Sequence, residues 1–323
     1  MLFRSTDPTP YAPRPVVIDT DPGIDDLLAL ELALKSPELD VRGISVSYGN
    51  TVVENAYRNA VEILRRVGRR ITIGVGARRP LRRELAVARE THGESGLGHA
   101  ALPPAGVILD FVKPLERMLA DQPAPVTLVT LGPLTSLALA LRREPAVVHE
   151  KVARHVAMAG TLEARGNTTP YVEFNAWCDP EALDTVLRAE LPTELVGLDV
   201  TRQVVLSGHD VNRIGRVAEP HAQWVYEALR FYLAFHRQAE HLDGCVVNDV
   251  LAIAALVLPD VLEFTELRVA VDLDDGETRG RTRVDPEGAL ARVATRVRPA
   301  PVRRLLFDRV LPWTQAPATT TVS

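Results

Sequence analysis

Hydrophobic and polar positions along the chain follow two patterns that alternate. Short, continuous apolar runs such as residues 16–20 (VVIDT) are typical of strands that are buried on both faces of a sheet. Longer segments such as residues 24–36 carry apolar residues every three or four positions, which predicts helices with a buried face. Further strand-like runs occur at 41–50, 71–77, 126–133, 155–160 and 193–200, and further helix-like segments at 52–68, 107–120, 134–145 and 179–190. This alternation predicts an α/β fold, an open, mostly parallel, Rossmann-like sheet with helices on both faces.

The last part of the chain departs from this alternation. Residues 267–285 contain two apolar runs around a polar, glycine-containing turn, which predicts a C-terminal β-hairpin, and residues 301–311 predict a closing helix. Residues 1–14 and 314–323 are proline-rich or polar and lack periodicity, so we predict two flexible tails. One domain spanning residues 15–313 lies between them.

Composition excludes several classes of protein. With 323 residues, 46% hydrophobic and 24% charged, the chain has the composition of a soluble globular protein. A net charge of −5 argues against nucleic acid as a partner. No apolar run approaches the roughly 20 residues of a membrane-spanning helix, and the first residues lack the apolar core of a signal peptide, so we predict no membrane partner and a cytoplasmic location. The two cysteines, Cys178 and Cys245, are predicted to be free thiols.

An acidic cluster follows the first predicted strand, within residues 16–30 (VVIDTDPGIDDLLAL). The strand ends in Asp19 and Asp21, the chain turns at a Pro-Gly pair, and a helix begins at Asp25 and Asp26. Four like charges in one turn must take up protons, bind a cation or accept several backbone hydrogen bonds at neutral pH. Ligands of open parallel sheets bind at the carboxyl ends of the strands, and ligands that are all oxygen favour calcium or magnesium over zinc. We therefore predict a metal site here.

Other interpretations of the aspartates explain less of the pattern. Helix capping accounts for at most two of them. An EF-hand loop needs a glutamate at its twelfth position, whereas Glu31 falls one residue late and a proline lies inside the loop. A phosphate-transferring aspartate requires only an Asp-X-Asp pair and leaves the second pair unexplained.

The segment DTDPGIDD resembles the N-terminal signature of the inosine-uridine nucleoside hydrolase family. Similar segments follow in the family's order: SYGN, HGESGLG, TLGPLTSLA, MAG followed by GN and EFN, WCDPEA, and NDVLAIAAL. The resemblance runs from about residue 16 to 300. It implies calcium-dependent hydrolysis of the N-glycosidic bond of ribonucleosides, which yields ribose and a free nucleobase.

The resemblance also assigns the metal ligands. It implies that calcium is held by the carboxylates of Asp21, Asp26 and Asp249 and by the backbone carbonyl of Thr130, a mixture that suits the ion. Asp21 is then also the general base that takes a proton from a calcium-bound water. Asp19 is expected to support the site without binding the ion. Asp249 could instead cap the apolar helix that follows it.

The resemblance implies a set of ribose-binding side chains. Carboxylates and amides suit ribose because each hydroxyl both donates and accepts hydrogen bonds, so we expect 2′-deoxynucleosides to react poorly. Some of these residues could instead be turn residues or core filler. The expected residues are Asp25, Asn50, Met158, Asn167, Glu173 and Asn175.

The acid that protonates the departing base is the open part of this interpretation. Many family members carry histidine immediately before the last metal-binding aspartate, whereas Asn248 stands here and cannot deliver a proton at neutral pH. His92, His236 or His241 could replace it, or the base could leave with little help. The alternatives are a protein that binds nucleosides without hydrolysing them, and a hydrolase of another ribosyl compound resembling nicotinamide riboside.

Three further expectations concern the surroundings of the site. The family is usually dimeric or tetrameric, so we predict a homodimer or homotetramer. The loop between about 77 and 106 is predicted to close over the substrate. Aromatic residues could stack on the base or belong to the core; the candidates are Trp177, Trp224, Tyr226, Phe231 and Tyr232.

Overall fold

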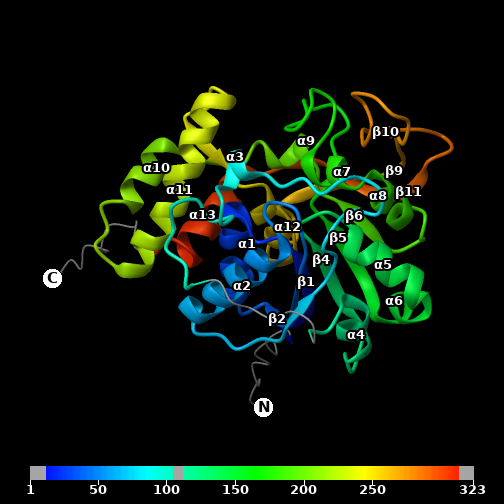
Figure 1. Ribbon diagram of the computed structural model, residues 1–323, viewed down its shortest axis with the longest axis horizontal. Helices are drawn as coiled ribbons and strands as arrows, with labels where there is room; N and C mark the ends of the chain where they lie inside the picture. The colour runs from blue at the N-terminus through cyan, green and yellow to red at the C-terminus, as the bar shows by residue number, and fades with distance from the viewer. Residues whose placement is uncertain (1–11, 105–111, 313–323) are drawn as a thin grey trace, which may run out of the picture.

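A nine-stranded sheet forms the centre of the molecule (Figure 1), in a computed structural model that describes residues 12–104 and 112–312. The strand order is β10-β9-β11-β6-β5-β4-β1-β2-β3. Strands β1 to β6 and β11 pair in parallel, whereas β9 pairs antiparallel with both β10 and β11. Their bounds are β1 Arg14–Thr20, β2 Leu39–Val46, β3 Ile73–Val75, β4 Val126–Thr130, β5 Val152–Ala157, β6 Thr193–Leu195, β9 Leu262–Val271, β10 Thr282–Val284 and β11 Ala289–Val297. The predicted mostly parallel α/β fold is confirmed.

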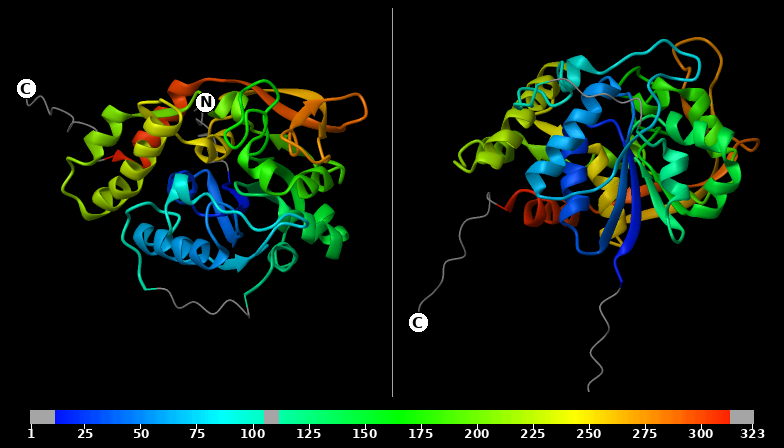
Figure 2. Two further views of the ribbon diagram at one scale, coloured as in Figure 1. Left: turned by 45° about the horizontal axis from the view of Figure 1, so that its top comes forward. Right: turned by 60° about the horizontal axis from the view of Figure 1, so that its bottom comes forward.

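Helices cover both faces of the sheet because successive strand residues point to opposite sides. In β1, Val16 and Ile18 join one apolar cluster and Val17 joins the other, and all three side chains are fully buried. The first cluster contains α1 (Ile24–Lys35), α2 (Val53–Val67), α12 (Asn248–Val257) and α13 (Pro299–Arg309). The second contains α4 (Leu115–Ala120), α5 (Thr135–Arg143), α6 (Pro145–Lys151) and α8 (Pro180–Leu187). The two groups lie on opposite sides of the sheet in Figures 1 and 2.

A smaller unit stands beside the sheet. Strands β7 (Val205–Ser207) and β8 (Gly244–Val246) pair antiparallel, and α10 (Gly208–Ile214) and the long α11 (Pro220–Ala239) pack on them. Short helices complete the chain: α3 (Arg89–His92), α7 (Phe174–Cys178) and α9 (Leu198–Thr201). No helix among the described residues is long and apolar enough to span a membrane.

Several predicted boundaries need correction. The predicted strand at 193–200 ends at Leu195, because the chain turns into α9, whose N-cap is Gly197. The helix predicted at 107–120 begins only at Leu115, after the cap residue Pro114, and residues 105–111 lie outside the described residues. Strand β1 starts at Arg14, the last residue of the predicted N-terminal tail. The predicted C-terminal hairpin is confirmed as β9 and β10, and both cysteines are free thiols.

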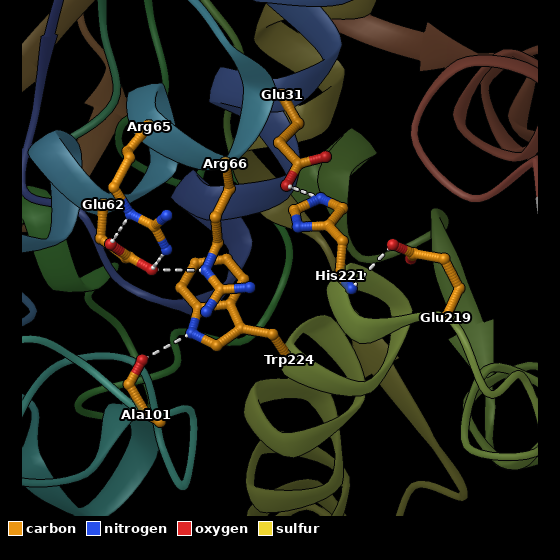
Figure 3. Close-up of polar contacts among 8 residues, drawn as sticks. All are labelled: Glu31, Glu62, Arg65, Arg66, Ala101, Glu219, His221 and Trp224. Carbon is orange, nitrogen blue, oxygen red and sulfur yellow. Dashed lines mark hydrogen bonds and ion pairs between the residues drawn. The ribbon is translucent and has the colours of Figure 1, made fainter.

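Contacts at the start of α11 fix this helix against the main domain (Figure 3). His221 Nε2 lies 2.7 Å from Oε1 of Glu31 in α1. Trp224 Nε1 donates a 2.8 Å hydrogen bond to the carbonyl of Ala101, and the Arg66 guanidinium of α2 lies 4.2 Å from the centroid of the Trp224 ring. Three separate segments therefore hold one end of α11, and its other end reaches the pocket described next.

Candidate active site

A cavity of about 490 Å³ lies at the carboxyl ends of the central strands, where the loops after β1, β2, β4 and β5 meet α11 and α12. This is the expected ligand position of an open α/β sheet. Eleven of the residues singled out from the sequence line it: Asp25, Asn50, His92, Met158, Asn167, Glu173, Asn175, Tyr232, His236, Asn248 and Asp249. Three others, Asp21, Asp26 and Thr130, are buried outside the lining. The fold thus gathers side chains that are more than 200 positions apart in the sequence.

Three carboxylates converge at one side of this cavity. Asp25 and Asp26 lie in the first turn of α1, and Asp249 lies in the first turn of α12, which packs against α1. One carboxylate oxygen from each lies within 4.8 Å of the other two. The N-termini of two helices therefore point at one group of acidic side chains, and their dipoles favour negative charge there.

Asp21 is held next to this group by tight backbone packing. Its Oδ2 accepts a 2.6 Å hydrogen bond from the backbone N–H of Asn50, while its Oδ1 has no hydrogen-bond partner among the described residues. Gly49 and Gly132 flank the carboxylate, and a Cβ at either position would collide with it. Both glycines are therefore required for the backbone to approach Asp21 so closely.

Asp26 has a different set of contacts. Its Oδ2 accepts hydrogen bonds from the backbone N–H of Gly23 (2.9 Å) and from Asn50 Nδ2 (2.8 Å), and its Oδ1 accepts one from the Thr20 hydroxyl. Asn50 therefore contacts both Asp21 and Asp26, through its backbone and its side chain respectively. These contacts orient the two carboxylates before any ligand binds.

The electrostatics of the cluster favour an added cation. Burial, reinforced by the charge of Asp26, raises the pKa of Asp25 to about 7. Burial raises the pKa values of Asp21 and Asp249 well above the ordinary range, with further repulsion from the neighbouring aspartates. Asp19, raised to a pKa of about 7 by burial, lies close by. Across residues 12–104 and 112–312 no lysine or arginine pairs with these side chains, and Oδ1 of both Asp21 and Asp25 lacks a hydrogen-bond partner. Buried oxygens with these properties fit a hard divalent cation.

The backbone carbonyl expected from Thr130 points elsewhere. Thr130 ends β4, and its carbonyl accepts a 2.9 Å hydrogen bond from the backbone N–H of Met158, while its hydroxyl contacts His155. The next residue, Leu131, lines the cavity. The structure therefore places Leu131 rather than Thr130 at the pocket. Side-chain type could not show this, because a carbonyl is available at every residue.

The Glu173 carboxylate binds mainly backbone N–H groups. Its carboxylate accepts hydrogen bonds from the backbone N–H groups of Gly160 (2.9 Å), Asn175 (2.8 Å) and Ala176 (3.0 Å). Burial raises its pKa, and these hydrogen bonds oppose that shift. Glu173 therefore caps α7 and ties this helix to the loop after β5, in addition to lining the pocket.

Asn167 and Asn175 each use one side-chain atom for a structural contact and leave the other for a ligand. Asn175 Nδ2 donates to the carbonyls of Leu131 (2.6 Å) and Met158 (2.9 Å), and Asn167 Oδ1 accepts from the backbone N–H of Phe174 (2.8 Å). Within the described residues no hydrogen bond engages Asn175 Oδ1 or Asn167 Nδ2, so both atoms can bind a ligand. The structural and the binding interpretations of these residues are therefore compatible.

One part of the cavity is aromatic. Tyr232, Phe235 and His236 of α11 and His92 of α3 line it, and the His92 and Tyr232 ring centroids are 5.3 Å apart. Phe235 was not expected, although its position three residues after Tyr232 on one helix could have indicated it. The remaining aromatic candidates and the alternative acid lie outside the lining: Trp177, Trp224, Tyr226, Phe231 and His241.

Hydrogen bonds hold the imidazoles of His92 and His236 in neutral forms. His92 Nδ1 accepts from the backbone N–H of Ile24 (3.0 Å), so this nitrogen carries no proton. His236 Nδ1 donates to the carbonyl of Tyr232 (2.9 Å), and its Nε2 accepts from the N–H of Val246 (3.4 Å). Burial lowers the pKa of His92 to about 3 and also lowers that of His236. Neither ring is a charged acid at neutral pH.

Asn248 lies beside the acidic cluster. Its Oδ1 accepts a 2.8 Å hydrogen bond from the Thr201 hydroxyl, which leaves its Nδ2 facing Asp25 Oδ2 at 3.5 Å. The amide is thus oriented by α9 and serves as a donor toward the cluster. Of the predicted closing loop, residues 87–92 line the pocket, and closure itself stays a prediction.

Known proteins resemble this chain over most of its length. The family model for inosine-uridine preferring nucleoside hydrolases matches residues 16–304. The pyrimidine-specific ribonucleoside hydrolase RihA of Photobacterium profundum is 39% identical over 279 residues, which cover 84% of this chain and 89% of that protein. RihA of Citrobacter koseri is also 39% identical, over 276 residues covering 84% and 88%.

Solved structures show the same likeness in three dimensions. A plant nucleoside hydrolase, PpNRh1, superimposes with a TM-score of 0.85 at 32% identity and covers 94% of this chain and 100% of that one. A purine-preferring ribonucleoside hydrolase from Gardnerella vaginalis superimposes with a TM-score of 0.85 at 27% identity, covering 93% and 99%. The similarity therefore extends across the whole sheet and the pocket at its edge.

Proposed function

The chain belongs to the inosine-uridine preferring nucleoside hydrolase family, and we propose that it is a calcium-dependent hydrolase of pyrimidine ribonucleosides. The observation that carries this proposal is one cavity whose lining combines members of a buried carboxylate cluster with aromatic side chains. Such a lining suits a substrate that joins a polar sugar to a flat base. The pyrimidine preference rests on the 39% identity to relatives that are pyrimidine-specific.

The carboxylates supply the cation site. Asp25, Asp26 and Asp249 are within reach of a single ion, Asp21 is adjacent, and Leu131, whose backbone carbonyl we propose as a further ligand, lines the same cavity. These donors are all oxygen, and calcium accepts six to eight oxygens, including water and substrate hydroxyls. Calcium bound here would lower the pKa of a water molecule and hold the ribose hydroxyls.

Asp21 is suited to take the proton from the attacking water. Its Oδ1 is unpartnered, while the backbone N–H of Asn50 fixes its Oδ2 and so orients the free oxygen. The transition state of N-glycoside cleavage develops positive charge on the ribose ring, which nearby carboxylates stabilise. Asn167 Nδ2 and Asn175 Oδ1 would bind ribose hydroxyls, because their partner atoms are already held by the backbone. Tyr232 and Phe235 would pack on the base.

Assembly and location complete the proposal. We expect a homodimer or homotetramer, as the sequence resemblance implies, and a cytoplasmic protein. Sedimentation velocity at micromolar concentration tests the first, and fractionation of the source cells tests the second. A monomer, or recovery outside the cytoplasm, would contradict the corresponding expectation without affecting the chemistry.

Release of free base from a panel of ribonucleosides tests the activity. Uridine, cytidine, inosine, guanosine and adenosine are each incubated with calcium and again after chelation and dialysis. We expect calcium-dependent release that is fastest from a pyrimidine. Calorimetric binding of nucleosides without release would instead favour a binding protein, and release that persists after chelation would contradict the calcium site.

A further inference from the structure

Departure of the nucleobase needs a stabilising group, and none of the pocket side chains described so far is a cationic donor. When the bond from C1′ to the base nitrogen breaks, its electron pair stays on the base. His92 and His236 are neutral in their hydrogen-bonded forms, and the Asn248 amide has no proton to give. Without an acid, the base leaves as an anion, which a cationic hydrogen-bond donor can stabilise.

Two cationic side chains occur among the described residues that line the cavity, Arg89 and Arg202. The Arg89 side chain is 62% exposed and lies 3.6 Å from Glu94, itself 82% exposed. The Arg202 side chain is only 31% exposed and lies 3.4 Å from Glu240, which also lines the cavity. Arg202 is therefore the more enclosed cation, and its charge is less screened by water.

Arg202 contacts Glu240, the C-cap of α11, the helix whose aromatic side chains are expected to pack on the base. It follows Thr201 at the end of α9, and Thr201 binds the Asn248 amide. Arg202 and His236 line the same cavity, and the charge of Arg202 adds to burial, the main cause, in lowering the pKa of His236. Glu240 engages one nitrogen of the guanidinium, which has five N–H donors and keeps others for a ligand.

We propose that Arg202 donates a hydrogen bond to an exocyclic oxygen of the bound nucleobase and stabilises the negative charge that the base gains as it leaves. This inference rests on the proposed ribonucleoside hydrolysis and adds a specificity determinant to it. Bases with such an oxygen, namely uracil, cytosine, hypoxanthine and guanine, can use the contact. Adenine has none and cannot. Glu240 acts as a positioning residue that holds the guanidinium.

The step balances without any further reactant. The water oxygen forms a bond to C1′ and one of its protons passes to Asp21. The bond from C1′ to the base nitrogen breaks, and its electron pair spreads over that nitrogen and the exocyclic oxygen that Arg202 contacts. The base then takes a proton from solvent, and Asp21 returns its proton to solvent. Arg202 acts only as a hydrogen-bond donor and transfers no proton in the step.

Arg202→Gln tests the proposal with two substrates. Uridine needs stabilisation of its leaving group, whereas p-nitrophenyl riboside releases a nitrophenolate that is stable by itself. We expect kcat for uridine to fall about 100-fold or more, the size expected for loss of a charge-stabilising donor, while kcat for p-nitrophenyl riboside stays unchanged. The variant should also favour 5-fluorouridine over uridine more than the parent does, because fluorine makes the base a better leaving group.

Three further variants make the result interpretable. Arg89→Gln, which removes the other arginine of the lining, should leave the ratio of the two activities unchanged. Arg202→Lys should restore part of the uridine activity, because it keeps the charge and loses the planar fork. Glu240→Gln should lower uridine activity less than Arg202→Gln, since it frees the guanidinium without removing it.

Defined outcomes would overturn the proposal. Equal losses on both substrates in Arg202→Gln would show that Arg202 supports the fold, and a loss on neither would show that it does not touch the base. A parent protein that hydrolyses neither substrate would instead overturn the ribonucleoside hydrolase proposal, and this inference with it. Thermal melting and calcium binding of the variant identify a folding defect, which Arg202→Lys is expected to avoid.

Discussion

Two of the regions that contain buried carboxylates treat them in opposite ways. At the junction of α1 and α11, Glu31 is fully buried, but Lys35 Nζ lies 2.6 Å from one of its oxygens. His221 Nε2 lies 2.7 Å from the other oxygen, a contact drawn in Figure 3. In the pocket, Asp25 and Asp249 are just as buried and face other carboxylates. The same helix, α1, carries carboxylates of both kinds.

The pKa values separate the two regions further. Hydrogen bonds from Arg65 and Arg66 lower the pKa of Glu62, another carboxylate of the α11 junction. Burial raises the pKa of Asp25 to about 7. Because an isolated buried charge is costly, a chain normally supplies its own counterion. The cluster that lacks one is therefore the place where a cation from solution is expected to bind.

The largest expected effect comes from Asp249→Asn, which replaces one pocket carboxylate by a neutral group of the same shape. We expect calcium affinity to fall by at least about 100-fold, because loss of a direct ligand costs more than loss of a side chain that only supports a ligand. We expect uridine hydrolysis to fall at least as far. Isothermal calorimetry and base release measure the two. Wild-type calcium affinity in this variant would remove Asp249 from the ligand set.

Glu31→Gln tests the other region with a comparable change. Loss of charge next to Lys35 and His221 should lower the free energy of unfolding by about 1–3 kcal/mol and leave calcium affinity unaltered. Glu54→Gln is the matched control, because the Glu54 side chain is 53% exposed and should cost less than about 1 kcal/mol. Urea denaturation at pH 7 gives both values. If Glu31→Gln weakened calcium binding as strongly as Asp249→Asn, the distinction between the regions would fail.

Removal of the 2′-hydroxyl from the substrate is expected to lower kcat/KM by an intermediate amount. The pocket presents carboxylates and free amide atoms to the sugar, and polar groups that lose their hydroxyl partner on binding a deoxyribose are left unpaired. We expect kcat/KM for 2′-deoxyuridine to be at least about tenfold below that for uridine, the ratio for a missing bond of about 1.4 kcal/mol. Steady-state kinetics on the pair decide this, and equal values would contradict the ribose assignments.

Proton linkage should distinguish the regions as well. In the metal-free protein the raised pKa of Asp25 contributes stability that is present below about pH 4 and is lost as pH rises toward 7. Calcium requires the ionised form, so binding releases protons and weakens as pH falls from 8 to 5.5. Calorimetry in buffers of different ionisation enthalpy measures this release. Binding without proton release at pH 6 would argue against raised pKa values in the cluster.

The smallest expected effect is that of Glu62→Gln on the free energy of unfolding. Its lowered pKa gives stability that is present above the ordinary carboxyl pKa and is lost on acidification, the reverse of Asp25. Glu62→Gln should therefore lower the free energy of unfolding by about 0.5–1 kcal/mol at pH 7 and by almost nothing at pH 3. The value at pH 7 is small because the Arg65 side chain is 65% exposed, so water screens the ion pair. Thermal melts at both pH values check it. An equal loss at the two pH values would point to packing rather than charge.

The sequence predicted the local parts of this architecture well. The β1–α1 unit and its aspartates could be located because an apolar run, a Pro-Gly turn and a helix follow one another directly. The hairpin of β9 and β10 was visible for the same reason. The return of β11 to pair with β6 was not predicted, since neighbours within a sheet are set by long-range packing.

Prediction of the site from the sequence was limited in the same way by long-range packing. Side chains with distinctive chemistry, such as Asp249 and Asn175, were predicted, and the fold brings them to one cavity. The place of Leu131 in the lining was missed because an apolar residue after a strand does not show in the sequence that it faces a pocket. Arg202 was missed because it is one of many arginines, and its enclosure depends on tertiary contacts. The neutral state of His92 likewise follows from its contact with Ile24, 68 positions away.

Titration of calcium into the chelated protein, with uridine hydrolysis followed at each point, tests the central claim most directly. We predict no base release without the ion and a rise to saturation at one calcium per chain, with half-maximal activity at the calcium concentration that half-saturates binding. Uridine hydrolysis that is unchanged by complete removal of divalent cations would contradict the account.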